Sequence, residues 1–537
     1  MKKLRNTIAC GVAALALLAT GLTSCTGDFD NINTSKDKPT PEDVDRDNAW
    51  AAFIQTMQRN VFAEGANAYQ LADNLLGDSY AGYFGQAQDW DSGSNSTCYA
   101  FPTAKWKDEP YKQAYNNVMS SWNILRQKVD SASVVFALGE VVKVQAMHRV
   151  TDIYGPLPYT AFGKMSSGLP YDSQETVYRT FIKELDHALK TLKAAYEADS
   201  GAKPIADFDV VFDSDLEKWI RFANSLKLRL AMRIVYTDFT TDDGRTPQQL
   251  AEEAVSSELG VIEDNSGNAM YTGFGKDGNP FYVCFFSYKS GAGDHRVAAD
   301  IASFMNGYAD PRRASYFNES AFAAGGYAGL RNGIQIPDDE RINNFSRYNV
   351  TASTSLMWMN ASEVAFLRAE GALRGWAMGG DARTFYEEGI RLSFERCGVA
   401  DQLTAYMAST ALPGGYDDPA FGYSCSNQST VTIPWNDGAA FEENLERIIT
   451  QKWIANFPLG TEAWADYRRT GYPRLFPVVV NNNPDITNLQ LGARRMTYPL
   501  EEYEANGETI RAAVDQWLGG QDKMSTRLWW DCNPRIR

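Results

Sequence analysis

The sequence predicts a mainly α-helical fold in which helix pairs stack as in an α-solenoid. Apolar residues recur with helical spacing over several stretches of about 15–25 residues, whereas strand-like alternation is short and rare. A hydrophobic fraction of 44% beside 22% charged residues describes a chain with a large core. No clean tetratricopeptide signature, with its period of about 34 residues, recurs along the chain, so the periodicity alone does not establish tandem repeats.

The first 25 residues predict a lipoprotein signal. Three basic residues within the first five precede an apolar run, which is shorter than a membrane-spanning helix and ends in Leu22-Thr23-Ser24-Cys25. This lipobox-like ending predicts that residues 1–24 are a signal peptide and that Cys25 is acylated; an ordinary secreted protein with a chance cysteine is the alternative. Acyl chains would then hold the protein on a membrane without a spanning segment.

Residues 25–40 are predicted to be the lipidated cysteine and a polar tether, and residues 41–537 are predicted to form a single helical domain. Ser214-x-x-Glu217 is expected to begin one helix as a capping box, and Asp172-x-x-Glu175 another. Short strands are expected near residues 281–288 and 431–435. The predicted helices are 41–63, 111–129, 133–152, 172–197, 214–236, 296–306, 361–376, 381–396 and 442–457.

The net charge argues against two classes of binding partner, and the cysteine spacing argues against a disulfide framework. The net charge is −16, and loss of the basic signal peptide would make it more negative still, so neither nucleic acid nor an anionic lipid surface is expected as a partner. Acidity here serves solubility; calcium binding is an alternative that no motif supports, and no cofactor is predicted. The five cysteines after Cys25 are scattered and form no CxxC, which favours free thiols over disulfides.

The usual catalytic and metal-binding motifs are missing. Only three histidines occur, at His148, His187 and His295, and no HExxH, G-x-S-x-G, P-loop or dinucleotide fingerprint is present. The sequence therefore predicts no catalytic residue and no metal ligand. A pair of carboxylates for glycoside hydrolysis stays open as an alternative, because 67 acidic residues will place some pairs close together by chance.

Three loop-rich stretches, 77–110, 260–295 and 410–440, carry aromatic residues among Gly, Asn, Asp and Ser. Long loops of this kind are usually functional or disordered, and their aromatic content argues against disorder. A flat ring beside amide and carboxylate groups suits a sugar, whose C–H face packs on the ring, and it suits an extended peptide equally. The predicted ligand-binding residues are Tyr83, Asp89, Trp90, Asn279, Tyr282, Phe286 and Tyr288.

Eight short segments, spread over nearly the whole length after Cys25, resemble one known family in their joint order. This family is the SusD/RagB nutrient-binding outer-membrane lipoproteins of Bacteroidota. Read by themselves, several of these segments are scaffold: TDIYGPLPY makes a rigid turn, and Trp464, Tyr467, Arg468 and Arg469 clamp the C-terminal helices. The segments are DFDNIN from Asp28, TDIYGPLPY from Thr151, PYDSQ from Pro170, WIRFANSLKLRLAMRI from Trp219, DPR from Asp310, EGALRGW from Glu370, ITQKWIANFPLGTEAWADYRRTGYPRL from Ile449 and RLWWD from Arg527.

The resemblance implies tetratricopeptide-like helix pairs with an irregular face that carries the ligand site. It implies a lipid-anchored protein exposed at the surface of the outer membrane, covering a SusC-like TonB-dependent barrel as a lid. The implied function is capture of a glycan for delivery into that barrel, without chemistry on the ligand. The runner-up is the same role for oligopeptides; a surface glycoside hydrolase and a purely structural scaffold are less favoured alternatives.

Overall fold

Consecutive helices pack against one another in the computed structural model of the protein, which describes residues 49–90, 95–101, 105–164, 168–322 and 325–536. Within the compact unit Ala51–Arg537, α8 (Val134–Tyr154) packs on α9 (Gln174–Ala198), and α10 (Leu216–Arg233) packs on α11 (Pro247–Ser256). α15 (Ala361–Leu373) packs on both α16 (Ala382–Arg396) and α18 (Phe441–Asn456). The predicted mainly α fold of helix pairs is confirmed.

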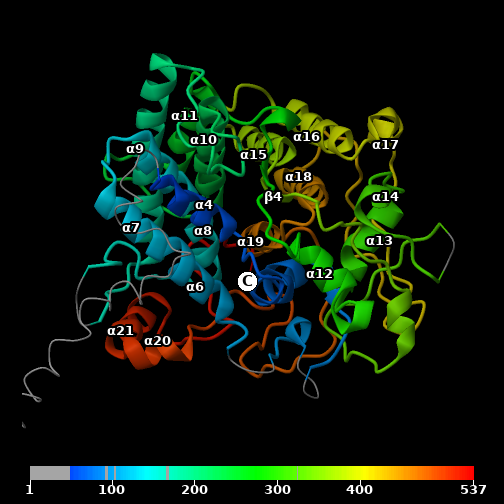
Figure 1. The fold of residues 1–537 in the computed structure, drawn as a ribbon. Helices are drawn as coiled ribbons and strands as arrows, with labels where there is room; N and C mark the ends of the chain where they lie inside the picture. Colours follow the sequence, from blue (N-terminus) through cyan, green and yellow to red (C-terminus); the bar gives the residue numbers. More distant parts are fainter. Residues whose placement is uncertain (1–48, 91–94, 102–104, 165–167, 323–324, 537) are drawn as a thin grey trace, which may run out of the picture. The chain divides into compact units, whose positions relative to one another are not determined.

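The remaining helices are short. In Figure 1, α12, α13 and α14 lie on the right among irregular chain, whereas α8–α11 lie on the left. None of the described helices is long and apolar enough to cross a membrane. The short helices are α4 (Ala51–Arg59), α5 (Ala66–Tyr69), α6 (Glu109–Gln113), α7 (Ser120–Lys128), α12 (Pro280–Phe286), α13 (Ala299–Gly307), α14 (Arg313–Tyr316), α17 (Leu403–Met407), α19 (Gly460–Thr470), α20 (Leu500–Ala505) and α21 (Gly507–Trp517), with π-helical turns at η1 (Gln70–Asp78) and η3 (Ala114–Met119) and 3₁₀ turns at η2 (Ser96–Cys98), η4 (Asn265–Gly267), η5 (Lys289–Gly291), η6 (Glu340–Asn344) and η7 (Ala400–Gln402).

Two small antiparallel sheets support the irregular part. β1 (Phe84–Gln86) pairs with β3 (His295–Val297), so that Phe84 lies opposite Val297. β2 (Ala269–Tyr271) pairs with β4 (Leu356–Met359) with a register shift at its first two residues. The first sheet joins two of the three predicted loop regions, because β1 lies within 77–110 and β3 begins at the last residue of 260–295.

The helix starts differ from the predicted capping boxes by one residue. α10 is capped by Asp215, whose side chain accepts from the Lys218 amide at 3.1 Å, while Ser214 instead accepts from the Ile205 amide. α9 is capped by Ser173, and the carboxylate of Asp172 accepts from the Thr160 amide at 2.7 Å. Both predicted caps were wrong by one residue. The side chains of Ser214 and Asp172 accept from amides of the preceding segment, and the next residue caps the helix in each case.

The predicted strands at 281–288 and 431–435 are also wrong. Residues 280–286 form the helix α12, with Pro280 at its first position and Asn279 as its cap. Residues 431–435 are irregular. A run of aromatic residues favours a strand by composition. Here, however, Asn279 and Pro280 begin a helix of two turns. The described part of the predicted helix 41–63 is α4, which ends at Arg59, and α11, α19, α20 and α21 are helices that the pattern did not predict.

The helix layers meet in an interior that contains ion pairs as well as apolar side chains. Arg229 of α10 pairs with Glu363 of α15 at 2.7 Å, and both side chains are at most 2% exposed. Arg233 of the same helix contacts Asp152 of α8 and Glu462 of α19. Buried charges are tolerated only when paired and hydrogen-bonded, so these contacts specify how α8, α10, α15 and α19 fit together.

The turn predicted from TDIYGPLPY is held from outside by the C-terminal segment. The Tyr154 carbonyl accepts from Arg495, and the Pro156 carbonyl accepts from the Tyr498 hydroxyl at 2.7 Å. Gly155 has φ of 89°, which favours glycine. The scaffold interpretation of this segment therefore agrees with its contacts.

Candidate functional site

Trp90 and Trp106, both in the predicted loop 77–110, lie edge to face. Their ring centroids are 5.3 Å apart with planes inclined by 72°, and both side chains are half-buried, so part of each indole remains open to solvent. Next to Trp90, the Asp89 carboxylate accepts from the Gln335 side chain at 3.2 Å. Aromatic surface and hydrogen-bonding groups therefore lie together here. Asp89 and Trp90 were predicted as ligand residues, which stays a prediction, and Trp106 was not predicted.

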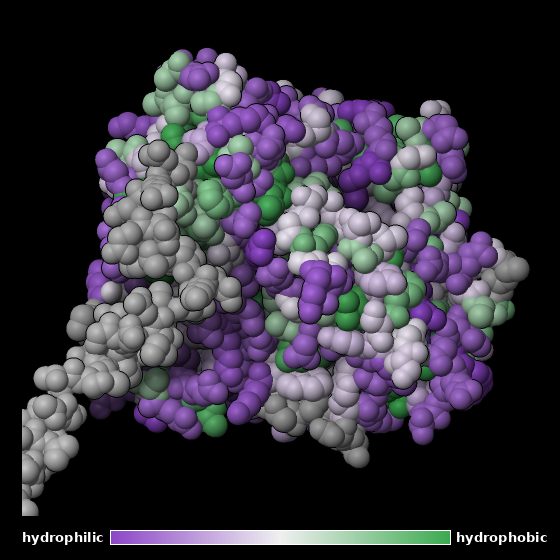
Figure 2. Space-filling view, viewed as in Figure 1, coloured by the Kyte–Doolittle hydropathy of each residue, from purple (hydrophilic) through white to green (hydrophobic). Residues whose placement is uncertain are grey.

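A second set of rings lies on α12. Tyr282 and Phe286, one turn apart, stack with centroids 5.6 Å apart and planes inclined by 28°. The guanidinium of Arg347 lies 5.3 Å from the Phe286 ring centroid. All three side chains are half-buried, and Figure 2 shows pale and green residues gathered where Figure 1 places α12. This face can pack against a flat apolar ligand surface.

Tyr288 follows α12 and lies apart from that stack. Its side chain is half-buried, and burial raises the pKa of its hydroxyl to about 12, with the nearby Cys284 and Asp294 acting in the same direction. The Tyr288 carbonyl accepts from the Gly293 amide at 2.9 Å, which closes the turn before β3. The side chain of Tyr288 is therefore only partly available to a ligand.

Tyr83 and Asn279 are buried and serve the fold. Tyr83 is fully buried; its hydroxyl donates to the Trp453 carbonyl at 2.6 Å, and its ring stacks on Trp453. Asn279 is 1% exposed; it accepts from the Phe281 amide and donates to the Thr354 carbonyl. Neither side chain has a free face, so the structure gives these two predicted ligand residues a packing role and a capping role instead.

The β1–β3 sheet connects the two aromatic sets. The Ala87 amide donates to the Asp294 carbonyl at 2.7 Å, and the Asp294 amide donates to the Cys284 carbonyl of α12 at 2.9 Å. Beneath the sheet, Phe84 packs its ring on Phe285, with centroids 4.8 Å apart. Two loops that are about 200 residues apart in sequence are thereby fixed side by side on one buried support.

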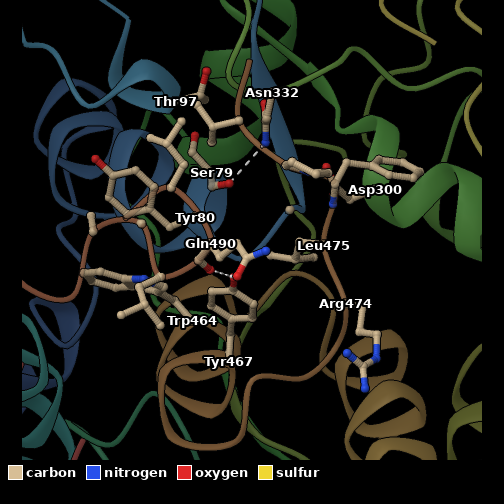
Figure 3. Close-up of a pocket in the computed structure, with 18 of the residues that line it drawn as sticks. Ser79, Tyr80, Thr97, Asp300, Asn332, Trp464, Tyr467, Arg474, Leu475 and Gln490 are labelled. Carbon is tan, nitrogen blue, oxygen red and sulfur yellow. Dashed lines mark hydrogen bonds between the residues drawn. The ribbon is translucent and has the colours of Figure 1, made fainter. Parts of the chain in front are cut away.

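A half-open cavity of about 330 Å³ lies between α19 and the irregular chain that follows it (Figure 3). Ser79, Tyr80 and Thr97 from the predicted loop 77–110 form one wall, and Trp464 and Tyr467 of α19 form another. The rest of the lining is Gly82, Asp300, Asn332, Gln428, Gly471, Arg474, Leu475, Phe476, Pro477, Val478, Leu489, Gln490, Leu491, Gly492 and Ala493.

The aromatic side chains of this cavity are held by specific contacts. The Tyr467 hydroxyl donates to the Gln490 carbonyl at 2.9 Å, and the Tyr80 ring lies 5.1 Å from that of Trp464. Trp464 is 1% exposed, with the guanidinium of Arg468 lying 3.6 Å from its ring centroid. Trp464 and Tyr467 thus belong to the scaffold, as expected, and they also border a cavity that the sequence did not reveal.

The described histidines and cysteines do not gather into a metal site. Among the described residues, no group of three or more His, Cys, Asp or Glu side chains is arranged to hold a metal ion. His148 contacts Glu462, His187 pairs with Glu140 at 2.6 Å, and His295 is buried in β3. The five described cysteines are free thiols, in agreement with the prediction from their spacing.

The predicted lipidation site, Cys25, lies outside the described residues, and so do the boundaries expected at residues 24 and 40. These remain predictions from the sequence.

Comparison with known proteins agrees with this architecture. Residues 31–531 match the family model described as SusD-like, "Susd and RagB outer membrane lipoprotein". No curated protein matches the chain significantly. A SusD homologue from Bacteroides uniformis is 41% identical, with 91% of this chain and 100% of that chain covered and a TM-score of 0.83.

Two further solved structures are similar over almost their whole length. A SusD homologue from Bacteroides thetaiotaomicron is 40% identical, with 90% of this chain and 99% of that one covered and a TM-score of 0.82. A chitin-binding SusD homologue from Flavobacterium johnsoniae is 37% identical over the same shares, with a TM-score of 0.85. The family model and these identities over nearly complete chains show that this protein belongs to the SusD-like family of outer-membrane lipoproteins.

Proposed function

We propose that the protein captures a glycan at the cell surface and delivers it to a SusC-like TonB-dependent transporter of the outer membrane, without chemical change to the glycan. The observation that carries the proposal is the pair of open indoles, Trp90 and Trp106, beside the hydrogen-bonded Asp89 and Gln335. The C–H faces of a sugar can pack on the indoles while its hydroxyls exchange hydrogen bonds with the carboxylate and amide.

The stacked rings of Tyr282 and Phe286 extend this argument to a polymer. The β1–β3 sheet fixes them relative to the loop of Trp90. Rings at two places on a fixed support favour a long ligand that touches both, since each contact contributes little by itself. The chitin-binding relative, 37% identical to this chain, also supports a glycan as the ligand class.

Oligopeptides are the second candidate, since aromatic pockets also accept apolar side chains. The two ligand classes separate by the groups that they require. A sugar needs the side-chain acceptors and donors of Asp89 and Gln335, whereas a peptide binds mainly through its backbone and side-chain volume. Asp89→Ala should therefore weaken a glycan more than a peptide.

Calorimetric titration of the full chain in detergent would test the proposal. The ligands would be chitin oligosaccharides, a panel of other polysaccharides and a mixed peptide pool, with mass spectrometry of each glycan after incubation. Saturable binding of one glycan class with its mass unchanged is the expected result. Binding of peptides alone would move the protein to the second candidate, and a shortened glycan would identify a hydrolase.

The partner and the anchor require a separate test. The proposal expects the protein to co-purify with a SusC-like barrel from outer membranes solubilised in mild detergent. It also expects protease added to intact cells to reach the protein, because a lid over the barrel faces outward. Protection from protease in intact cells with cleavage after lysis would contradict the surface location.

A further inference from the structure

The cavity beside α19 is built differently from the two aromatic surfaces. Neither Trp90 and Trp106 nor Tyr282 and Phe286 line it. Its volume of about 330 Å³ lies at the lower end of the range of about 300–1,000 Å³ typical of small-molecule sites. The cavity therefore fits one ring-sized ligand rather than a length of polymer.

Asp300 is the buried charged group of the cavity. Its side chain borders Gly82, whose φ of 70° lets the backbone approach closely, and the residue is 2% exposed. One carboxylate oxygen accepts from the Phe476 amide at 2.7 Å. Among the described residues, Asp300 forms no ion pair, and burial raises the pKa of its carboxyl even though Arg331 acts to lower it. A buried carboxylate of this kind gains from hydrogen-bond donors on a ligand.

The charges around the cavity favour a neutral ligand. Arg474 lies at the rim and has Glu446 as its partner at 3.1 Å, so its charge is already matched. An anion entering the cavity would be repelled by the carboxylate of Asp300. A cation would be repelled by the guanidinium of Arg331, which lies near enough to Asp300 to act on its pKa. A neutral molecule with several hydroxyl groups satisfies Asp300 without either repulsion.

The walls offer apolar contact along one side of such a molecule. Trp464 and Tyr467 both line the cavity, and Arg468 covers one face of the Trp464 ring. The Tyr467 hydroxyl is committed to the Gln490 carbonyl, and Figure 3 shows the two side by side. The ring is thereby held in position as a wall, against which the C–H groups of a sugar can pack.

We propose that this cavity is a second carbohydrate site, which takes one neutral pyranose ring with neighbouring hydroxyls donating to Asp300 and C–H groups packed on Tyr467. The choice of a carbohydrate rests on the proposed function, whereas the cavity and its lining do not. A site for one ring, distinct from the indole pair, would hold a branch or chain end of a glycan whose main chain lies on the outer surfaces.

Saturation-transfer NMR and calorimetry with single sugars would test this site. The probes are glucose, galactose, mannose and N-acetylglucosamine, titrated against the full chain in detergent. At least one should bind saturably and lose about tenfold in affinity in Asp300→Asn, because a neutral amide accepts hydrogen bonds less strongly than a carboxylate. Tyr467→Ala should show a similar loss, whereas Tyr467→Phe, which keeps the ring, should bind nearly as the natural chain does.

Two controls protect the test. Asp300→Asn keeps an amide oxygen that can still accept from the Phe476 amide, and an unchanged melting temperature would verify the fold. Should Asp300→Asn fail to fold, Gln428→Trp decides instead. Gln428 lines the cavity and is only half-buried, so a larger ring in its place should reduce the space for a sugar while Asp300 itself is unchanged.

The results also separate this site from the proposed function. Trp90→Ala should leave binding of the single sugar unchanged while polysaccharide binding falls. If none of the four sugars binds, or if the folded cavity variants bind as tightly as the natural chain, the second site is refuted. If single sugars bind but no polysaccharide or peptide does, the proposed function fails and the cavity site stands.

Discussion

Arg469 of α19 and Glu370 of α15 form a two-point ion pair in the interior. Nη1 lies 2.5 Å from Oε1, Nη2 lies 2.8 Å from Oε2, and both side chains are 1% exposed. Arg374 contacts the same carboxylate from one helical turn away, and Arg469 also reaches Asp466. This cluster fastens α19, which borders the cavity, to the helix layer formed by α15.

Breaking this pair should destabilise the fold strongly. Glu370→Gln or Arg469→Met removes one charge from this buried cluster and leaves the remaining charges incompletely matched. We expect a loss of about 3–5 kcal/mol in the free energy of unfolding, measured by urea denaturation. Glu387→Gln is the matched control, because its i,i+4 partner Arg383 is 55% exposed, and it should cost less than about 1 kcal/mol. Similar losses in both variants would contradict the structural role of the buried pair.

The same carboxylate should govern acid stability. Burial would raise the pKa of Glu370, but Arg469 and Arg374 outweigh it and lower the pKa to about 2. The unfolded chain then binds this proton more readily, so the stabilisation is present above the ordinary pKa of 4.5 and is lost as the pH falls toward 2. In Glu370→Gln, the dependence of unfolding free energy on pH over this window should become shallower; an unchanged slope would assign it to other acids.

Glu140 of α8 should act in the opposite direction. Burial raises the pKa of its carboxyl to about 7, although the hydrogen bond from His187 opposes this. Here the folded state holds the proton more tightly, so stability should decrease as the pH rises from about 4.5 to 7. Glu140→Gln keeps the shape without the titration and should flatten this decrease, as followed by melting temperature across the range. A steeper decrease in the variant would show that the ionised carboxylate stabilises the fold.

Trp90→Ala should weaken glycan binding without unfolding the protein. Loss of one stacked contact corresponds to about 0.5–1.5 kcal/mol, or roughly two- to tenfold in affinity. Trp106→Ala should have a similar effect, and calorimetry with the bound glycan would measure both. Tyr83→Ala is the contrast, because this ring lies in the core and its removal should lower stability first. A lower melting temperature in Trp90→Ala with unchanged affinity would refute the ligand role.

Cys25→Ala should release the protein from the membrane fraction. The lipobox-like sequence predicts that this thiol carries the acyl chains, and no described helix can replace them as an anchor. Cys532→Ala, which removes an exposed cysteine far along the chain, should remain membrane-bound. Fractionation followed by immunoblotting would distinguish the two, and firm attachment of the Cys25 variant would mean that another contact retains it.

Helix positions were predictable wherever one apolar face was long. α8, α9, α10, α15, α16 and α18 all lie within about three residues of the predicted ranges, because periodic burial is a local property of the sequence. α19 was missed: its buried face carries Glu462, Asp466 and Arg469, which read as a solvated surface until their partners are known. Asn279-Pro280 is a local signal for the start of α12, but the aromatic composition of the following residues led to the prediction of a strand.

By itself the sequence determined the helical class, the family resemblance and the aromatic loops that carry the predicted site. Only the tertiary structure decided which of those aromatic residues can meet a ligand. Tyr83 and Trp90 are seven residues apart and equally aromatic, yet one is sealed against Trp453 and the other is open beside Trp106. The exposure of a side chain depends on contacts with residues far away in the chain. The cavity depends on such contacts too, because it brings Thr97 and Asp300 together with Tyr467. Spacing along the sequence does not encode these contacts.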